Sequence, residues 1–136
     1  MSTPHTRRPL EEPKPPFPEQ KQPPPGLERD QSPSPRWRGE RYQPAGKLAG
    51  QAALITGGDS GIGRSVAYHF AREGAEIALT YLPEERPDAE EIRDAIGELG
   101  RSCVLIEGDL RERQFCDQVI DRACDEFGRL DILVHN

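Results

Sequence analysis

Long apolar segments are missing from this sequence of 136 residues. No run of about 18 apolar residues is present that could cross a membrane as a helix. Residues 1–10 also lack the apolar stretch of a secretory signal peptide. We therefore expect a soluble, cytoplasmic protein without a membrane partner.

Cysteine is scarce too, and its spacing matches no metal-binding pattern. An odd number of cysteines in a chain without a secretory leader favours free thiols. The apolar positions of Cys103, Cys116 and Cys124 predict buried, unreactive side chains. The three histidines are dispersed along the chain, so no metal site is expected.

Positive charge is in deficit, with 18 Lys and Arg against 24 Asp and Glu. The deficit lies in residues 47–136, which carry ten basic and eighteen acidic side chains, whereas residues 1–46 carry eight and six. An acidic folded part argues against nucleic acid or an anionic membrane as the main partner.

Composition divides the chain at residue 46. Residues 1–46 hold twelve of the fourteen prolines and few apolar side chains, which predicts a disordered or polyproline-like tail. PxxP frames at 13–16 and 15–18, and Trp37 between two arginines, could dock an aromatic groove. The alternative is a solvated extension that packs along a neighbouring subunit. Residues 47–136 suffice for one small core.

Apolar runs and helical periodicity alternate through residues 47–136. Apolar runs without strict alternation are typical of strands covered on both faces, and we expect them at 52–56, 77–81, 103–106 and 130–134. Apolar residues at helical spacing predict helices at about 62–73, 87–99 and 112–127. With right-handed crossovers this order gives an α/β fold, a Rossmann-like, doubly wound parallel sheet of about four strands.

A glycine-rich turn follows the first strand and opens the first helix. Its spacing is Gly-x-x-x-Gly-x-Gly, formed by Gly57, Gly61 and Gly63. In such a turn one glycine permits the bend, one lets a pyrophosphate approach the backbone, and one lets the helix lie close to the strand. The first amides of the helix lack intrahelical partners and attract an anion. The turn therefore predicts a phosphate site.

Three motifs together are similar to the short-chain dehydrogenases/reductases. They are Thr56–Gly63, Gly108-Asp109-Leu110 after the third strand, and Gly128–Val134 before the terminal Asn. The sequence of residues 54–63 resembles that of a subgroup whose members carry a polar, proline-containing N-terminal extension. The resemblance covers 47–136, about the first half of a family domain. It implies a nicotinamide dinucleotide, hydride transfer to or from a carbonyl or alcohol, and a homo-oligomer.

The resemblance also implies the residues that hold the cofactor. The pyrophosphate and nearby ribose would be lined by Gly57, Gly61, Ile62 and Gly63. Asp59 and Ser60 could bond a ribose or simply hold the turn. Tyr81 ends the second strand, where an acid would bind the ribose hydroxyls and select NAD. This sequence has no acid there, and no Lys or Arg immediately before Gly61 or just after Tyr81. NAD and NADP therefore both stay open, with a slight preference for NADP because no acid would repel its 2′-phosphate.

Further contacts are implied after the third and fourth strands. Asp109 would accept a hydrogen bond from the adenine amino group, beside the backbone of Leu110. Alternatively, Asp109-x-x-Glu112 would form a capping box for the next helix. The family's Asn-Asn-Ala-Gly motif is present only as His135-Asn136, which leaves a contact from Asn136.

The family's catalytic Tyr-x-x-x-Lys is absent from this sequence. Tyr42, Tyr68 and Tyr81 are followed at the fourth position by Gly46, Arg72 and Glu85. Arginine cannot replace the lysine in this role, and we interpret Tyr68 and Arg72 as helix surface. No catalytic residue is named, and whether this chain is itself an enzyme is left open.

We expect a truncated reductase whose carbonyl or alcohol substrate would require the missing half. Without a fifth strand, the fourth would be an exposed edge. The alternatives are a nonenzymatic dinucleotide-binding module, a protein that interacts through its proline-rich tail and, last, a methyltransferase.

Overall fold

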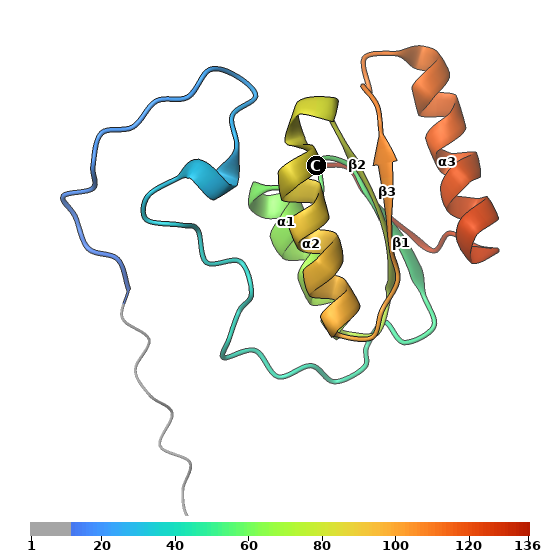
Figure 1. The fold of residues 1–136 in the computed structure, drawn as a ribbon. Helices are drawn as coiled ribbons and strands as arrows, with labels where there is room; N and C mark the ends of the chain where they lie inside the picture. The colour runs from blue at the N-terminus through green and yellow to red at the C-terminus, as the bar shows by residue number, and fades with distance from the viewer. Residues whose placement is uncertain (1–11) are drawn as a thin grey trace, which may run out of the picture.

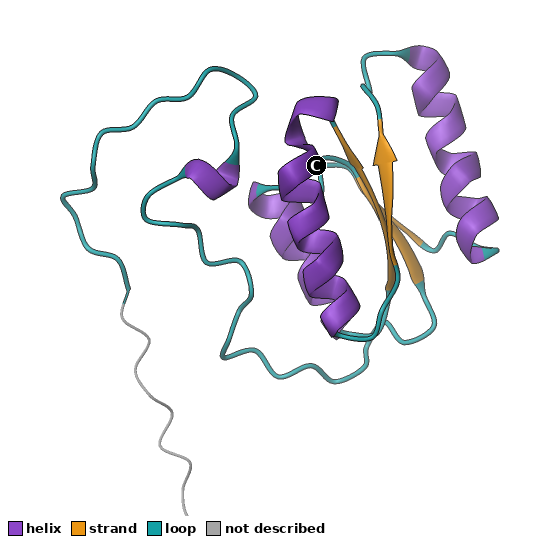
Figure 2. Ribbon diagram, viewed as in Figure 1, coloured by secondary structure: helices purple, strands orange, loops and turns teal. Residues whose placement is uncertain are grey.

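A parallel four-stranded sheet forms the centre of the protein (Figures 1 and 2). The structure is a computed structural model that describes residues 12–136. Its strands are β1 (Ala52–Ile55), β2 (Glu76–Tyr81), β3 (Cys103–Glu107) and β4 (Ile132–Val134). They lie in the order β3-β2-β1-β4, with all neighbours parallel. The predicted doubly wound sheet of four strands is confirmed.

Helices cover both faces of the sheet. α1 (Gly61–Arg72) and α2 (Arg86–Glu98) lie on one face, and α3 (Arg113–Phe127) lies on the other (Figure 1). The apolar side chains accordingly form two clusters, one with α1 and α2 and one with α3. β1 is buried at all four positions because it is a central strand with a helical layer on each side.

The predicted helices and strands begin and end within two residues of the observed ones. The largest difference is at β4, which begins at Ile132 instead of Leu130. Asp131 lies just before it, where its carboxylate accepts a hydrogen bond from the Ala52 amide at 2.8 Å and pairs with Arg129. A charged side chain with these partners closes the loop instead of extending the strand.

Two side-chain predictions require correction. Tyr68 is buried instead of lying on the helix surface, because the Trp37 ring packs edge-on against it at a centroid distance of 5.0 Å. The Arg72 guanidinium donates to the carbonyl oxygens of Gly39 and Tyr42 at 2.8 and 2.5 Å. The three cysteines are free but only partly buried; burial raises the pKa of Cys103 to about 12.

Residues 12–46 contain one 3-10 helix, η1 (Glu28–Asp30), and no strand or α-helix. The prediction of disorder for residues 1–11 lies outside the described residues. Residues 13–18 are exposed, so both PxxP frames are accessible. Trp37, in contrast, is buried in the core beside α1 and is not available to an outside groove. The extension is therefore anchored on this chain's own folded part.

Glu73 holds the end of the extension. Its carboxylate accepts hydrogen bonds from the Tyr42 hydroxyl and from the Ala45 and Lys47 amides, the last two at 3.0 and 2.8 Å. These donors lower the pKa of Glu73 to about 2, with the Tyr42 hydroxyl making the largest contribution. Residues 42–47 are thereby tied to the C-terminal end of α1.

Candidate cofactor site

The carboxyl ends of all four strands meet at one edge of the sheet. Parallel register aligns Ile55 with Leu79 and Val134, and Tyr81 with Glu107. The predicted site residues follow these strand ends. They are Gly57 to Gly63 after β1, Tyr81 at the end of β2, Asp109 and Leu110 after β3, and Asn136 after β4. In open α/β sheets ligands bind at this edge, where the strand order reverses.

The glycine turn between β1 and α1 is held by β2. The Gly57 amide donates to the Thr80 hydroxyl at 3.1 Å, and the Gly58 amide donates to the Thr80 carbonyl at 3.2 Å. Gly57 and Gly61 have φ of +57° and +54°, a region that favours glycine. The two bends let the chain leave β1 and enter α1 within five residues.

Gly63 is required for the close approach of α1 to the turn. A Cβ at this position would lie closer than 3.0 Å to the Gly57 carbonyl oxygen and 2.8 Å from the Asn136 amide nitrogen. Gly63 therefore lets the start of α1 lie close to the Gly57 backbone, in the turn that follows β1.

Asn136 contacts the turn itself. Its side-chain amide donates to the Gly57 carbonyl at 3.1 Å, and its backbone amide donates to the Thr56 hydroxyl at 2.9 Å. Asn136, just after β4, thus supports the glycine turn, and the cofactor contact that the resemblance implies for it stays a prediction.

The N-terminal end of α1 has the properties of an anion site. Ser60 precedes the helix without making a side-chain cap, and the first turn of α1 carries no acidic residue. Ile62 is 77% exposed, which leaves this end of the helix accessible. A Cβ at Gly61 would meet nothing within 4 Å, so open space adjoins the turn there. Backbone amides in such a position fit a phosphate group.

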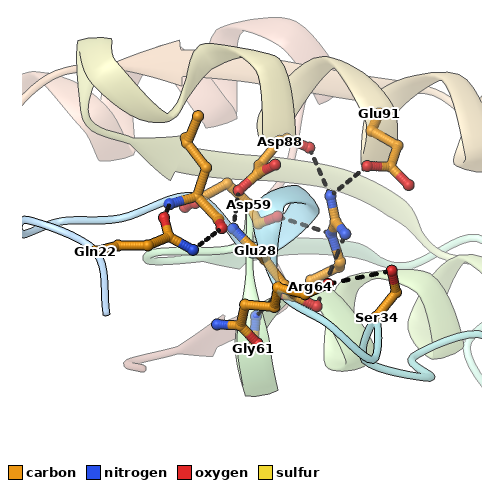
Figure 3. Close-up of polar contacts among 10 residues, drawn as sticks. Gln22, Glu28, Ser34, Asp59, Gly61, Arg64, Asp88 and Glu91 are labelled. Atoms are coloured by element: carbon orange, nitrogen blue, oxygen red, sulfur yellow. Dashed lines mark hydrogen bonds and ion pairs between the residues drawn. The ribbon is translucent and has the colours of Figure 1, made fainter. Parts of the chain in front are cut away.

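Asp59 is buried beneath the turn and is 1% exposed. Burial, helped by the charge of Glu85, raises the pKa of Asp59 to about 6. The Asp59 carbonyl accepts a hydrogen bond from Arg64 Nε at 2.8 Å (Figure 3). These contacts support the alternative in which Asp59 holds the turn; a ribose bond from Asp59 or Ser60 stays a prediction.

The end of β2 carries an aromatic side chain and a nearby cation. Tyr81 is buried, which raises the pKa of its hydroxyl. The guanidinium carbon of Arg86 lies 5.8 Å from the centre of the Tyr81 ring, and Arg86 pairs with Glu107 at 2.5 Å. Arg86 is five residues after Tyr81, so the sequence pattern did not place a cation beside this tyrosine. The η2 turn (Pro83–Glu85) brings Arg86 back toward the end of β2.

Asp109 does not cap α3, so the capping-box alternative is wrong. The helix begins at Arg113, and Glu112 precedes it without a side-chain cap. Asp109 instead accepts from the Arg111 amide at 2.9 Å and pairs with the Arg111 guanidinium, which lowers the pKa of Asp109. Its carboxylate stays at the sheet edge, with Leu110 36% exposed beside it.

A buried charged cluster joins the turn to α2 and to the extension (Figure 3). Arg64 is 2% exposed and bonds the Asp88 carbonyl and the Glu91 carboxylate, both at 3.1 Å. Glu28 from the extension lies 3.8 Å from Arg64 and is also buried. Sequence reasoning missed these residues because the cluster depends on contacts across long stretches of chain.

Within residues 12–136, no group of three or more His, Cys, Asp or Glu side chains is arranged to hold a metal ion. No helix in the same part of the chain is long and apolar enough to span a bilayer.

The fold and the glycine turn together define a Rossmann-like protein with open space beside Gly61, at the sheet edge where the strand order reverses. Residues 51–136 match the short chain dehydrogenase family. The chain belongs to this family.

Relatives with curated descriptions include an uncharacterized oxidoreductase of Bacillus subtilis, YhxD, which is 51% identical over 117 residues. The match covers 86% of this chain and 39% of that protein. The chloroplastic NADPH-dependent aldehyde reductase 1 of Arabidopsis thaliana is 43% identical over 117 residues, covering 82% of this chain and 41% of the relative. The chain thus spans about two fifths of these relatives' length.

Among solved structures, a short chain dehydrogenase from Burkholderia cenocepacia in complex with NADP is similar to this chain. It superimposes with a TM-score of 0.62 at 37% sequence identity, over 64% of this chain and 35% of that one. The part of the family domain that aligns is the N-terminal part, which contains the glycine turn.

Proposed function

We propose that residues 47–136 form the cofactor-binding half of a short-chain dehydrogenase/reductase and bind NADP at the edge formed by the four strand ends. The observation that carries this proposal is the turn from Gly57 to Gly63, where Ser60 makes no side-chain cap and open space adjoins Gly61 at the start of α1. Gly57, Gly61, Ile62 and Gly63 would hold the pyrophosphate. Asp109, with Leu110 beside it, would hold the adenine.

NADP is favoured over NAD for three reasons. The Burkholderia relative is described in complex with NADP, and the Arabidopsis relative is named as NADPH-dependent. No acid occupies the end of β2 to repel a 2′-phosphate, since Tyr81 stands there. Arg86 lies near the Tyr81 ring and offers a cation to such a phosphate.

The chemistry that the bound dinucleotide supplies is hydride transfer between a nicotinamide ring and a carbonyl or alcohol carbon. This chain's residues would bind and orient that cofactor. We assign proton transfer to a longer protein that contains a Tyr-x-x-x-Lys, because no tyrosine of this sequence has a lysine at the fourth following position. Substrate, assembly state and cytoplasmic location stay predictions.

Titration with NADP+ by calorimetry tests the binding site. Gly61→Leu places a side chain in the open space beside the turn and forces a positive φ on a residue with a Cβ. We expect this variant to lose measurable NADP+ binding while its far-ultraviolet circular dichroism stays native-like. Undiminished NADP+ affinity in a folded Gly61→Leu protein would refute the assignment of the turn.

Arg86→Gln tests the preference for the 2′-phosphate. Loss of one charge-assisted contact should weaken NADP+ binding by about tenfold and leave NAD+ binding unchanged. Arg93→Gln is the matched control on the same helix, since Arg93 pairs with its neighbour Asp94. Equal losses for both nucleotides in Arg86→Gln would mean that Arg86 acts on the fold and not on the phosphate.

A further inference from the structure

The extension places a carboxylate at the predicted phosphate site. The Gly61 amide, at the start of α1, donates a hydrogen bond to Glu28 Oε2 (Figure 3). The Glu28 side chain is 5% exposed, so it is inserted into the protein and does not lie on its surface. An amide that the glycine turn leaves free of helical partners is thus bonded to an anion from elsewhere in the same chain.

Glu28 is positioned from three directions. Its backbone amide donates to Asp88 Oδ2 at 2.7 Å, and its Oε1 lies 3.8 Å from Arg64 Nη1. The preceding turn is closed by Gln22, whose side chain accepts from the Leu27 amide at 2.7 Å and donates to the Leu27 carbonyl at 2.9 Å. The carboxylate is therefore delivered by an ordered segment, residues 22–31.

A phosphate and the Glu28 carboxylate can bind the same backbone amides. Both are anions, and both accept hydrogen bonds from amides at a helix N-terminus. A cavity of about 550 Å³ adjoins this point, between residues 20–31 and the turn residues Ser60 and Gly61. A phosphate that enters next to Gly61 would face a buried like charge, which is costly where water does not screen it.

With Glu28 inserted beside Gly61, several buried oxygens lack hydrogen-bond partners. Three buried carboxylate oxygens have no hydrogen-bond partner among the described residues: Glu28 Oε1, Asp59 Oδ2 and Asp88 Oδ1. Buried polar atoms without partners oppose folding into that state. Arg64 forms ion pairs with both Glu28 and Glu91, so the cluster has an excess of negative charge. The unpartnered oxygens and the excess of negative charge therefore oppose the arrangement in which Glu28 is inserted.

We propose that Glu28 is a built-in competitor of the cofactor phosphate, and that dinucleotide binding displaces residues 22–31 from the start of α1. This inference rests on the proposed function, because it assumes that the turn binds a dinucleotide. It gives the proline-rich extension a role in setting cofactor affinity.

The test compares three proteins of the full 136 residues: the wild type, Glu28→Gln and Glu91→Gln. Glu28→Gln keeps the size of the side chain and removes the competing charge. Glu91→Gln removes another carboxylate from Arg64 without touching Gly61. We expect NADP+ to bind Glu28→Gln about tenfold more tightly than the wild type, and Glu91→Gln within about twofold of it.

A second measurement needs no variant. Arg29 lies in η1, next to Glu28. Trypsin cleavage after Arg29 of the wild type, followed by mass spectrometry, should accelerate when NADP+ saturates the protein. Inorganic pyrophosphate, which carries the phosphates without the nucleosides, should accelerate it as well.

The outcomes separate the two proposals. If NADP+ binds all three proteins equally and leaves the Arg29 cleavage rate unchanged, the competitor role is wrong while the cofactor site stands. Tighter binding to both variants would mean that general charge, not the contact with Gly61, controls affinity, and would also overturn it. If none of the three proteins binds NADP+, the proposed function fails and the competitor role fails with it.

Discussion

Gly63→Ala measures how closely the glycine turn and α1 are packed. The added Cβ would lie closer than 3.0 Å to a backbone oxygen, that of Gly57, which cannot rotate away as a side chain could. Overpacking of this kind costs about 2 kcal/mol of unfolding free energy. Alanine is also the better helix former by about 1 kcal/mol, which leaves a net loss of about 1 kcal/mol. With a urea dependence of about 2 kcal/mol per M, the unfolding midpoint should fall by about 0.5 M.

Gly97→Ala is the matched control. Gly97 lies inside α2, and a Cβ there would meet nothing within 4 Å. Alanine is the better helix former by about 1 kcal/mol, so this variant should unfold about 0.5 M later in urea. Both substitutions carry the same gain in helix propensity, and the difference between them therefore isolates the clash at Gly63.

Urea titration followed by circular dichroism gives both midpoints under identical conditions. We expect shifts of opposite sign, with about 2 kcal/mol between the two variants. Equal midpoints for Gly63→Ala and Gly97→Ala would refute this expectation, because the turn would then have room for a side chain beneath the proposed phosphate site.

Three further substitutions test the charged and aromatic anchors. Burial raises the pKa of Asp59 from 3.8 to about 6, so between these pH values the folded state holds more protons than the unfolded state. The wild type should therefore lose unfolding free energy relative to Asp59→Asn as pH rises through this window, and a constant gap would contradict it. The pKa of Glu73 is lowered from 4.5 to about 2 by the Tyr42 hydroxyl and backbone amides. Glu73→Gln should be less stable than the wild type at pH 7, with the urea midpoints converging as pH falls from about 4.5 toward 2; a deficit that persists at pH 2 would argue against the ionised form. Trp37→Ala should cost about 3 kcal/mol in urea unfolding, whereas Phe17→Ala, at a side chain 54% exposed, should change it by less than about 0.5 kcal/mol. Equal small effects would mean that the extension is not anchored by Trp37.

Much of the fold could be predicted because it follows from local patterns. The apolar run of β1 and the helical spacing on α2 each lie within one segment, and the glycine spacing marks the turn between β1 and α1. Right-handed crossovers, with α1 and α2 on one face and α3 on the other, then give the order β3-β2-β1-β4. For the same reason the sequence places the turn residues, Tyr81 and Asp109 at the ends of parallel strands, which share one edge of the sheet.

The remaining features depend on contacts between distant segments. Tyr68 lies on α1 and is buried because the ring of Trp37, 31 residues earlier in the chain, packs edge-on against it. Glu28 lies in a proline-rich segment whose composition predicts no packed structure, yet it reaches Gly61. Arg86 approaches Tyr81 through the η2 turn. No periodicity or spacing in the sequence encodes these three contacts.

The most direct test of the account is nuclear magnetic resonance of uniformly labelled protein, titrated with NADP+. The amide signals of Gly61, Ile62 and Gly63 should shift together and saturate at the affinity found by calorimetry, because these amides form the start of α1. If NADP+ bound while these three signals stayed in place and another surface responded, the phosphate would lie elsewhere, and the assignment of the glycine turn would be wrong.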